Sequence, residues 1–85
     1  MIEITLGDTY FEKGFFNVPL YISNKLFNSV NGECEIKIKE KIFECKYRIA
    51  NKNGQIRVFG GKLLRDYFKN NFNKLDKIEV TIRVN

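Results

Sequence analysis

The fold is decided by residues 33–59, ECEIKIKEKIFECKYRIANKNGQIRVF, in which apolar and polar side chains alternate. Residues 33–38 and 41–49 each place an apolar side chain at every second position, which is the period of a strand with one buried face. We expect these two strands to pair as a hairpin across Glu40-Lys41. The side chains predicted to face the core are Cys34, Ile36, Ile38, Phe43, Cys45, Tyr47 and Ile49.

Outside the hairpin, residues 1–6 and 77–84 show the same alternation and predict two further strands. In the last strand the buried side chains are expected to be Ile78, Val80, Ile82 and Val84. Residues 15–18 form a shorter extended piece. Asn53-Gly54 is a common hairpin signal and turns the chain into a strand at residues 56–59.

Two segments have helical rather than extended character. Pro19 fits the first turn of a short helix that reaches Phe27, and Asn31-Gly32 is expected to close it and turn the chain. A second helix is predicted at residues 62–71, after the break at Gly60-Gly61. Its apolar side chains at helical spacing are Leu63, Leu64, Tyr67 and Phe68.

This order of elements predicts a mainly β (α+β) fold. Residues 9–14 are expected to be a polar arm. Six to seven strands with one apolar face, together with two short helices, favour a small open β-barrel whose ends are covered by the helices. The 85 residues allow a single domain, residues 1–85, with one modest core.

The composition is that of a soluble globular protein, with 44% hydrophobic and 29% charged residues. Fifteen Lys and Arg against ten Asp and Glu give a formal net charge of +5. Such a charge favours polyanionic partners, namely DNA, RNA or anionic lipid. Many lysines alternate with glutamates along the predicted strands, so part of the positive charge belongs to a solvated strand face.

Several functional classes are excluded or disfavoured by what the sequence lacks. No histidine is present, and Cys34 and Cys45 are not spaced as a metal-binding pair. Ser-His and Cys-His catalysis are therefore excluded, and no zinc site is expected. No glycine-rich nucleotide loop with a Lys-Ser pair follows Gly60-Gly61, so ATP, GTP and other cofactors are not expected. Without a long apolar run we expect no signal peptide, no membrane contact and a cytoplasmic location with reduced thiols.

A metal-dependent nuclease is a further class to weigh. Glu35-Ile36-Lys37 and Glu44-Cys45-Lys46 each match the Glu-x-Lys part of such sites. These sites also require an upstream Asp on a paired strand, and the earlier candidate, Asp8, lies in a predicted loop. Alternating Glu and Lys on a wet strand face is the ordinary explanation, so we expect neither a metal site nor enzyme activity.

The hairpin at residues 47–57, YRIANKNGQIR, carries side chains that read nucleic-acid bases. Asn and Gln pair bidentately with adenine, and Arg or Lys with guanine. The alternative is an ordinary turn, because Asn and Lys are common in exposed loops. Aromatic rings could also stack on unpaired bases, although most are predicted to face the core; these are Phe11, Phe15, Phe16, Phe43, Phe59, Phe68 and Phe72.

Two other stretches are similar to a known family. Val18-Pro19 is followed by eight positions ending in Phe27, and Gly60-Gly61-Lys62-Leu63-Leu64 leads through Phe68 to Asp76-Lys77-Ile78-Glu79-Val80. This pattern resembles the DNA-binding pseudobarrel family, which includes plant B-three domains and the effector or target-recognition domains of restriction endonucleases such as EcoRII and BfiI. Leu75 stands where the plant domains have Gly, and their basic arm is not matched, so the chain looks closer to the restriction-endonuclease branch.

The resemblance implies that two arms, residues 9–17 and 48–57, grip duplex DNA in its major groove. Asn and Gln, with Arg48 or Arg57, are expected to read base edges, while lysines hold phosphates. The residues that the resemblance assigns to the DNA interface are Tyr10, Glu12, Lys13, Asn17, Arg48, Asn51, Lys52, Asn53, Gln55, Arg57 and Lys62.

The function expected from the sequence is therefore sequence-specific binding of double-stranded DNA without catalysis. The chain would act as the recognition domain of a restriction system, with a nuclease domain or subunit as partner, or as a small regulator. A different class stays open: a protein-interaction module, ubiquitin-like or of the swapped-hairpin type, that uses a sheet face or edge. An exposed apolar patch without a basic concave surface would favour that class.

Overall fold

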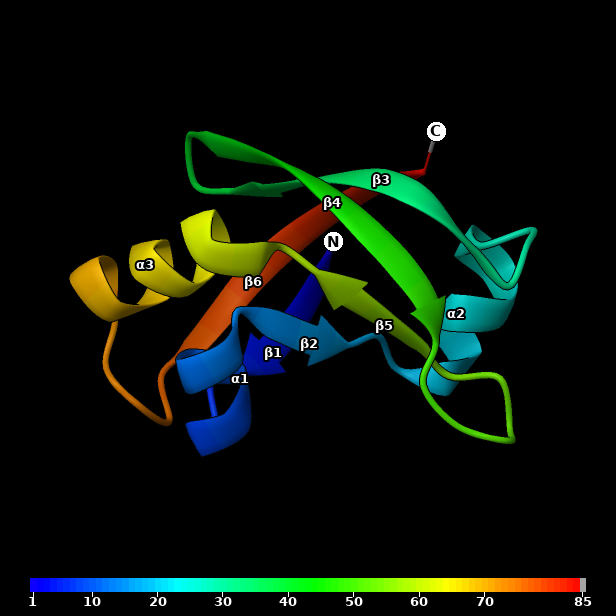
Figure 1. Ribbon diagram of the computed structural model, residues 1–85, viewed down its shortest axis with the longest axis horizontal. Helices are drawn as coiled ribbons and strands as arrows, with labels where there is room; N and C mark the ends of the chain where they lie inside the picture. Colours follow the sequence, from blue (N-terminus) through cyan, green and yellow to red (C-terminus); the bar gives the residue numbers. More distant parts are fainter. Residues whose placement is uncertain (85) are drawn as a thin grey trace.

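The computed structural model describes residues 1–84, which form six strands and three helices (Figure 1). The strands are β1 (Ile2–Thr5), β2 (Phe15–Asn17), β3 (Asn31–Ile38), β4 (Lys41–Ile49), β5 (Ile56–Phe59) and β6 (Lys77–Val84). The helices are α1 (Asp8–Lys13), α2 (Leu20–Leu26) and α3 (Gly61–Asn71).

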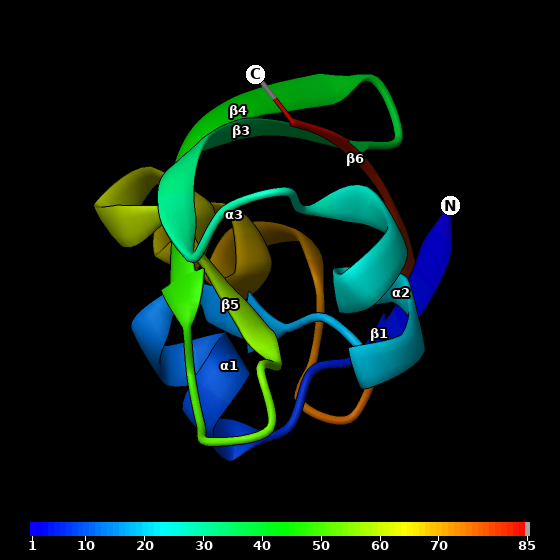
Figure 2. The same cartoon turned by 90° about the vertical axis from the view of Figure 1, so that its right-hand side faces the viewer.

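The six strands make one antiparallel sheet in the order β1-β6-β3-β4-β5-β2. The sheet curls into a nearly closed barrel, with β1 and β2 as its two edges (Figures 1 and 2). Helix α2 lies at one end of the barrel and α3 at the other. The small open barrel with helix-covered ends that the sequence predicts is confirmed.

The central hairpin of β3 and β4 has the predicted alternation. Cys34 is paired with Cys45, and both side chains face the interior. The turn lies one residue earlier than expected, because Ile38 pairs with Lys41 and leaves Lys39 and Glu40 as the turn residues. The inward side chains of this hairpin, with those of the other strands and of α3, fill one continuous core. Its large, fully buried side chains are Phe16, Phe68, Leu6, Ile36, Ile38, Leu64, Val18, Val58 and Val80.

Leu63, predicted on the apolar side of the second helix, is 76% exposed, and three predicted core side chains of β4 and β6 are less buried than expected. Ile49 is 39% exposed, because it is the last residue of β4 and has strand neighbours on one side only. Ile82 and Val84, near the end of β6, pack against the core but stay half-buried. The alternation therefore predicts the direction of each side chain correctly, whereas its burial falls off where the strands run past the body of the barrel.

The arm predicted at residues 9–14 forms a short helix, α1, which is a third helix beyond the two that the sequence predicts. Asp8 in the first turn and Lys13 in the last complement the helix dipole. Gly14 ends the helix with φ 75°, and its N–H bonds to the carbonyl of Tyr10. A Cβ at Gly14 would lie 2.6 Å from the carbonyl oxygen of Gly61, so only glycine lets the end of α1 approach the start of α3 this closely.

The turn predicted at Asn31-Gly32 is also corrected, since both residues belong to the first part of β3. Gly32 pairs with Tyr47, whose ring lies against it; a Cβ there would be 2.9 Å from the Tyr47 hydroxyl oxygen. That hydroxyl forms a hydrogen bond of 2.9 Å with Ser29 Oγ. Glycine at this position is required by packing against a buried ring rather than by a turn.

Ser23 is the buried polar residue of the described chain, with 2% of its surface exposed. The backbone N–H of Val18 bonds to the carbonyl of Ile56 at 2.8 Å. In place of the reciprocal backbone bond, the Ser23 hydroxyl donates to the carbonyl of Val18 (3.1 Å) and accepts from the N–H of Ile56 (3.2 Å). Helix α2 is thereby attached to the strands β2 and β5 through a single oxygen atom.

Candidate nucleic-acid interface

The two predicted arms lie on the same side of the barrel. In Figure 1 helix α1 and the loop at residues 50–55 both project downward, on either side of β2. The arms are also joined directly, because the last residues of the first arm form β2 and the last residues of the second arm begin β5. These two strands pair antiparallel, and Asn17 is opposite Arg57.

Arg57 is held by contacts that leave its charge intact. Its Nε donates a hydrogen bond of 2.7 Å to Asn17 Oδ1, and its guanidinium carbon lies 4.6 Å from the centre of the Phe15 ring. Arg48, directly opposite on β4, lies over Phe59 at 4.9 Å. We call the three residues Asn17, Arg57 and Arg48, which run across β2, β5 and β4, the arginine row.

The arginine row places two like charges directly opposite each other, an arrangement that destabilises an antiparallel pair. Within residues 1–84 neither Arg48 nor Arg57 has an acidic side chain within 4.0 Å. Aromatic rings and a neutral amide support the two cations instead, and such cation–π contacts at exposed sites contribute about 0.5–1 kcal/mol each. The charge of both guanidinium groups is therefore available to an external anion.

Three lysines, on α1, in the loop at 50–55 and on α3, are predicted to bind phosphates. Lys13 ends α1, Lys52 lies in the loop at 50–55, and Lys62 is in the first turn of α3. All three are exposed, and none forms an ion pair with another described residue. The start of α3 adjoins the first arm, since the Gly60 N–H bonds to the carbonyl of Gly14 at 2.9 Å.

Glu12 has protein partners of its own. Its carboxylate lies 3.3 Å from Lys69 Nζ and 3.5 Å from Lys74 Nζ. The hydrogen bond and charge of Lys69, and then the charge of Lys74, hold the pKa of Glu12 below its usual value. These contacts join α1 to α3 and its exit, so Glu12 serves the first arm by positioning it, and its predicted contact with DNA stays a prediction.

The amide side chains of the second arm bond to one another. Asn51 Nδ2 donates to Gln55 Oε1 at 2.9 Å, and the Gln55 N–H donates to Asn51 Oδ1 at 3.3 Å. The Ala50 N–H bonds to the carbonyl of Gln55 at 2.7 Å and closes the loop on itself. The bonds between Asn51 and Gln55 fix the orientation of the Asn51 amide and engage the side-chain oxygen of Gln55. Asn53 is exposed at the tip beside Gly54.

Tyr10 is half-buried and belongs to the framework of the first arm. Its hydroxyl accepts a hydrogen bond of 3.1 Å from the backbone N–H of Asn17. Its ring packs edge-on against Phe15, with 5.9 Å between ring centres. Through these contacts Tyr10 fixes the two residues that hold Arg57.

Phe15 and Phe59 belong to the candidate site, although the aromatic residues of which they are part were expected mostly to face the core. Both are half-buried on the outer face, paired with each other across β2 and β5 with 5.6 Å between ring centres. The signal for their direction was present, because their neighbours Phe16 and Val58 are the buried ones and alternate positions face opposite sides of a strand. Their pairing under two arginines depends on strand register, which no local pattern gives.

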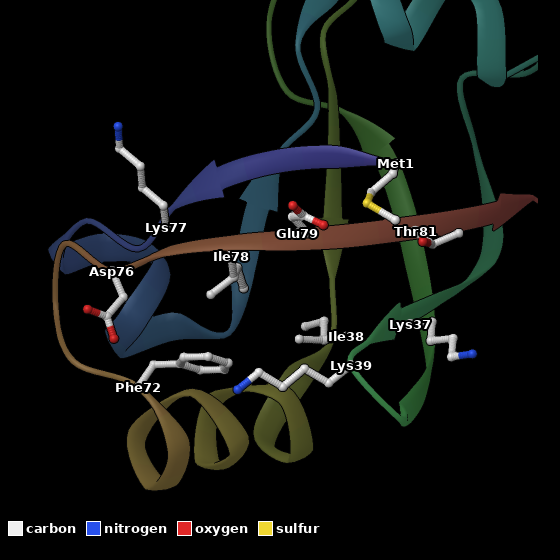
Figure 3. Close-up of a pocket in the computed structure, with 10 residues that line it drawn as sticks. All are labelled: Met1, Lys37, Ile38, Lys39, Phe72, Asp76, Lys77, Ile78, Glu79 and Thr81. Carbon is white, nitrogen blue, oxygen red and sulfur yellow. The ribbon is translucent and has the colours of Figure 1, made fainter.

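A cavity of about 610 Å³ lies elsewhere, and none of the predicted site residues lines it (Figure 3). The pairing of β3 with β6 ends at Lys37 and Thr81, and the cavity lies beyond this point. Ile38, Ile78 and Phe72 line its apolar part, and Lys39 extends across it with its ammonium 5.2 Å from the centre of the Phe72 ring. This mixed lining gives no chemistry that points to a particular ligand.

The cysteines are free and buried, as partners in the β3–β4 pair. Burial raises the pKa of the Cys34 thiol to about 11 and that of Cys45 to about 12. At neutral pH both are protonated and therefore poor nucleophiles and metal ligands.

Among residues 1–84 no group of three or more Cys, Asp or Glu side chains is arranged to hold a metal ion. None of the helices described has the length and apolar character needed to cross a membrane.

Known proteins do not identify the chain further. No protein-family model, curated protein or solved structure matches it. The similarity to the pseudobarrel family therefore rests only on the residues that suggest it.

Proposed function

We propose that the protein binds double-stranded DNA in a sequence-specific manner, with both arms entering the major groove. The observation that carries this proposal is the cross-strand pair of Arg48 and Arg57, neither of which has a carboxylate of residues 1–84 in contact with it. Such a pair lowers the stability of the free protein, and a polyanion that neutralises it recovers that free energy on binding.

The shape of the second arm supports duplex DNA over other polyanions. A two-stranded ribbon fits the major groove of B-DNA, and β4 and β5 with their loop form such a ribbon at residues 48–57. Arg48 and Arg57 lie at its base and Lys52 in its loop. The first arm lies on the same side and carries Lys13, so the two arms can contact the backbone on both sides of one groove.

The proposed role is that of a binding domain without catalysis. It would serve as the recognition domain of a restriction system that works with a nuclease domain or subunit, or as a small regulator. Selection from a random duplex library, followed by sequencing of the bound fraction, tests this directly. Enrichment of one motif is expected; enrichment of none would overturn the proposal and favour a protein-interaction module.

The electrostatic part of the proposal is tested with Lys52→Ala against a matched control. Lys41→Ala also removes an exposed lysine near a hairpin turn, but at the tip of the β3–β4 hairpin. We expect Lys52→Ala to weaken binding to all duplexes alike and to reduce the slope of log K against log salt by about 0.9, and Lys41→Ala to leave it unchanged. Equal slopes for both variants would show that the arms are not the contact surface.

A further inference from the structure

We infer that Arg57 reads a guanine in the DNA site, while Asn51 and Gln55 hold the loop rather than read adenine. This inference rests on the proposed function and makes it more specific. It separates three of the predicted base-reading side chains into one reader and two supporting residues, on the basis of which of their hydrogen-bonding atoms are already engaged.

The free donors of Arg57 match guanine. A guanidinium carries five N–H donors, and the Nε–H of Arg57 is bonded to Asn17 Oδ1 at 2.7 Å. The two terminal nitrogens remain, side by side, as a pair of donors. In the major groove guanine presents two neighbouring acceptors, O6 and N7, whereas adenine presents one acceptor beside a donor, and thymine one acceptor beside a methyl group. Guanine is therefore the only base whose major-groove edge can accept hydrogen bonds from both terminal nitrogens of Arg57.

Arg57 is also ordered before DNA arrives. Its guanidinium lies over Phe15, which is itself in contact with Phe59 and Tyr10, with ring centres 5.6 and 5.9 Å away. Together with the Asn17 bond, this contact restricts the side chain in the free protein, so less conformational entropy is lost when it binds a base. Arg48 has a ring beneath it but no hydrogen bond to a described side chain. Arg48 is therefore the better phosphate contact.

The side-chain amides of Asn51 and Gln55, unlike the terminal nitrogens of Arg57, are already hydrogen-bonded to each other's residue. The Asn51 side chain uses its oxygen and its nitrogen to bond Gln55. Adenine recognition needs the same two atoms of one amide at once. Because these bonds fix the orientation of the Asn51 amide and engage the Gln55 oxygen, we infer that either amide gives up part of them when it binds adenine, which reduces the net discrimination it provides.

The experiment uses the duplex motif obtained by selection, with each guanine replaced in turn by 7-deazaguanine, which lacks N7. Binding is measured by fluorescence anisotropy for the natural protein, Arg57→Lys and the matched variant Arg48→Lys, after thermal unfolding has shown that each is folded. Both substitutions keep the positive charge but remove the fork of donors.

At one guanine we expect 7-deazaguanine to weaken binding of the natural protein at least about fivefold, the fold-change that corresponds to about 1 kcal/mol. Arg57→Lys, whose ammonium lacks the fixed pair of donors, should be less sensitive to the replacement than the natural protein, and Arg48→Lys as sensitive as the natural protein. Asn17→Ala, which releases the Nε–H, should reduce the discrimination between guanine and 7-deazaguanine more than it reduces affinity for random duplex. If Arg57→Lys stays fully sensitive, or the selected motif holds no guanine, the inference is wrong while DNA binding stands; failure to select any motif refutes the proposed function itself.

Discussion

The hydroxyl of Ser23 should contribute more to stability than any other single polar atom of the described chain. Replacing Ser23 with alanine removes the oxygen that lies between the carbonyl of Val18 and the N–H of Ile56, 3.1 and 3.2 Å away. The methyl group that remains can neither donate nor accept. Both backbone groups are buried, so each loses its partner and water cannot replace it.

The magnitude follows from these two groups. A buried polar group left without a partner costs about 1–3 kcal/mol, and partial closure of the strands would recover some of this, so we expect a loss of about 2–4 kcal/mol. With an unfolding entropy of about 2.1 cal/mol/K per residue near 60 °C, the 85 residues give roughly 0.18 kcal/mol/K. The melting temperature should therefore fall by about 11–22 °C.

The assay is urea unfolding followed by circular dichroism, together with amide hydrogen exchange. Ser29→Ala is the matched control, because it also removes a serine hydroxyl with two partners, but at an exposed position. We expect a loss of about 1 kcal/mol or less for Ser29→Ala, and faster exchange of the Ile56 amide in Ser23→Ala alone. A Ser23→Ala variant within about 0.5 kcal/mol of the natural protein would show that the strands close directly and that the hydroxyl is dispensable.

Two further perturbations follow from the core. Gly32→Ala should lower the free energy of unfolding in urea by about 1–3 kcal/mol, because its Cβ would lie 2.9 Å from the Tyr47 hydroxyl oxygen. Gly7→Ala is the control: nothing lies within 4 Å of the added Cβ, so stability should change by less than about 1 kcal/mol. Equal effects of the two substitutions would contradict the packing argument. Between pH 9 and 12 the natural protein should lose stability more steeply than a Cys34→Ala, Cys45→Ala double variant. The pKa values of the two thiols are raised in the folded protein, from 9.0 to about 11 and about 12, so the thiols stay protonated there while those of the unfolded chain release their protons. The difference should reach up to about 1.4 kcal/mol per pH unit for each thiol, and parallel profiles would refute it.

The strands could be predicted because one buried face imposes a strict period of two. Residues 33–38 and 41–49 show this period without interruption, and the structure confirms both strands and their pairing. Helix α1 could not be predicted in the same way. Its six residues form too short a segment for a helical pattern, and contacts far away in the sequence stabilise it, such as those of Glu12 with Lys69 and Lys74.

The candidate site was predictable in its parts but not in its assembly. The second arm follows from the composition of residues 47–57, and the first from the family resemblance. The contact between Asn17 and Arg57 joins positions 40 residues apart and depends on the register of β2 against β5. The same register decides that Phe15 and Phe59 support arginines, although alternation with the buried Phe16 and Val58 already indicates their outward direction.

The loop at residues 50–55 is closed by its own hydrogen bonds, through Ala50, Asn51 and Gln55, whereas Arg57 is anchored in the sheet. The two parts of the second arm are therefore separable as engineering units. A loop of different length or composition can be grafted between Ile49 and Ile56, which pair as the last rung before it, without disturbing the side chains that hold Arg57. The barrel would then offer one constant contact to every target and an exchangeable segment beside it, an arrangement in which new specificities arise by loop replacement rather than by redesign of the framework.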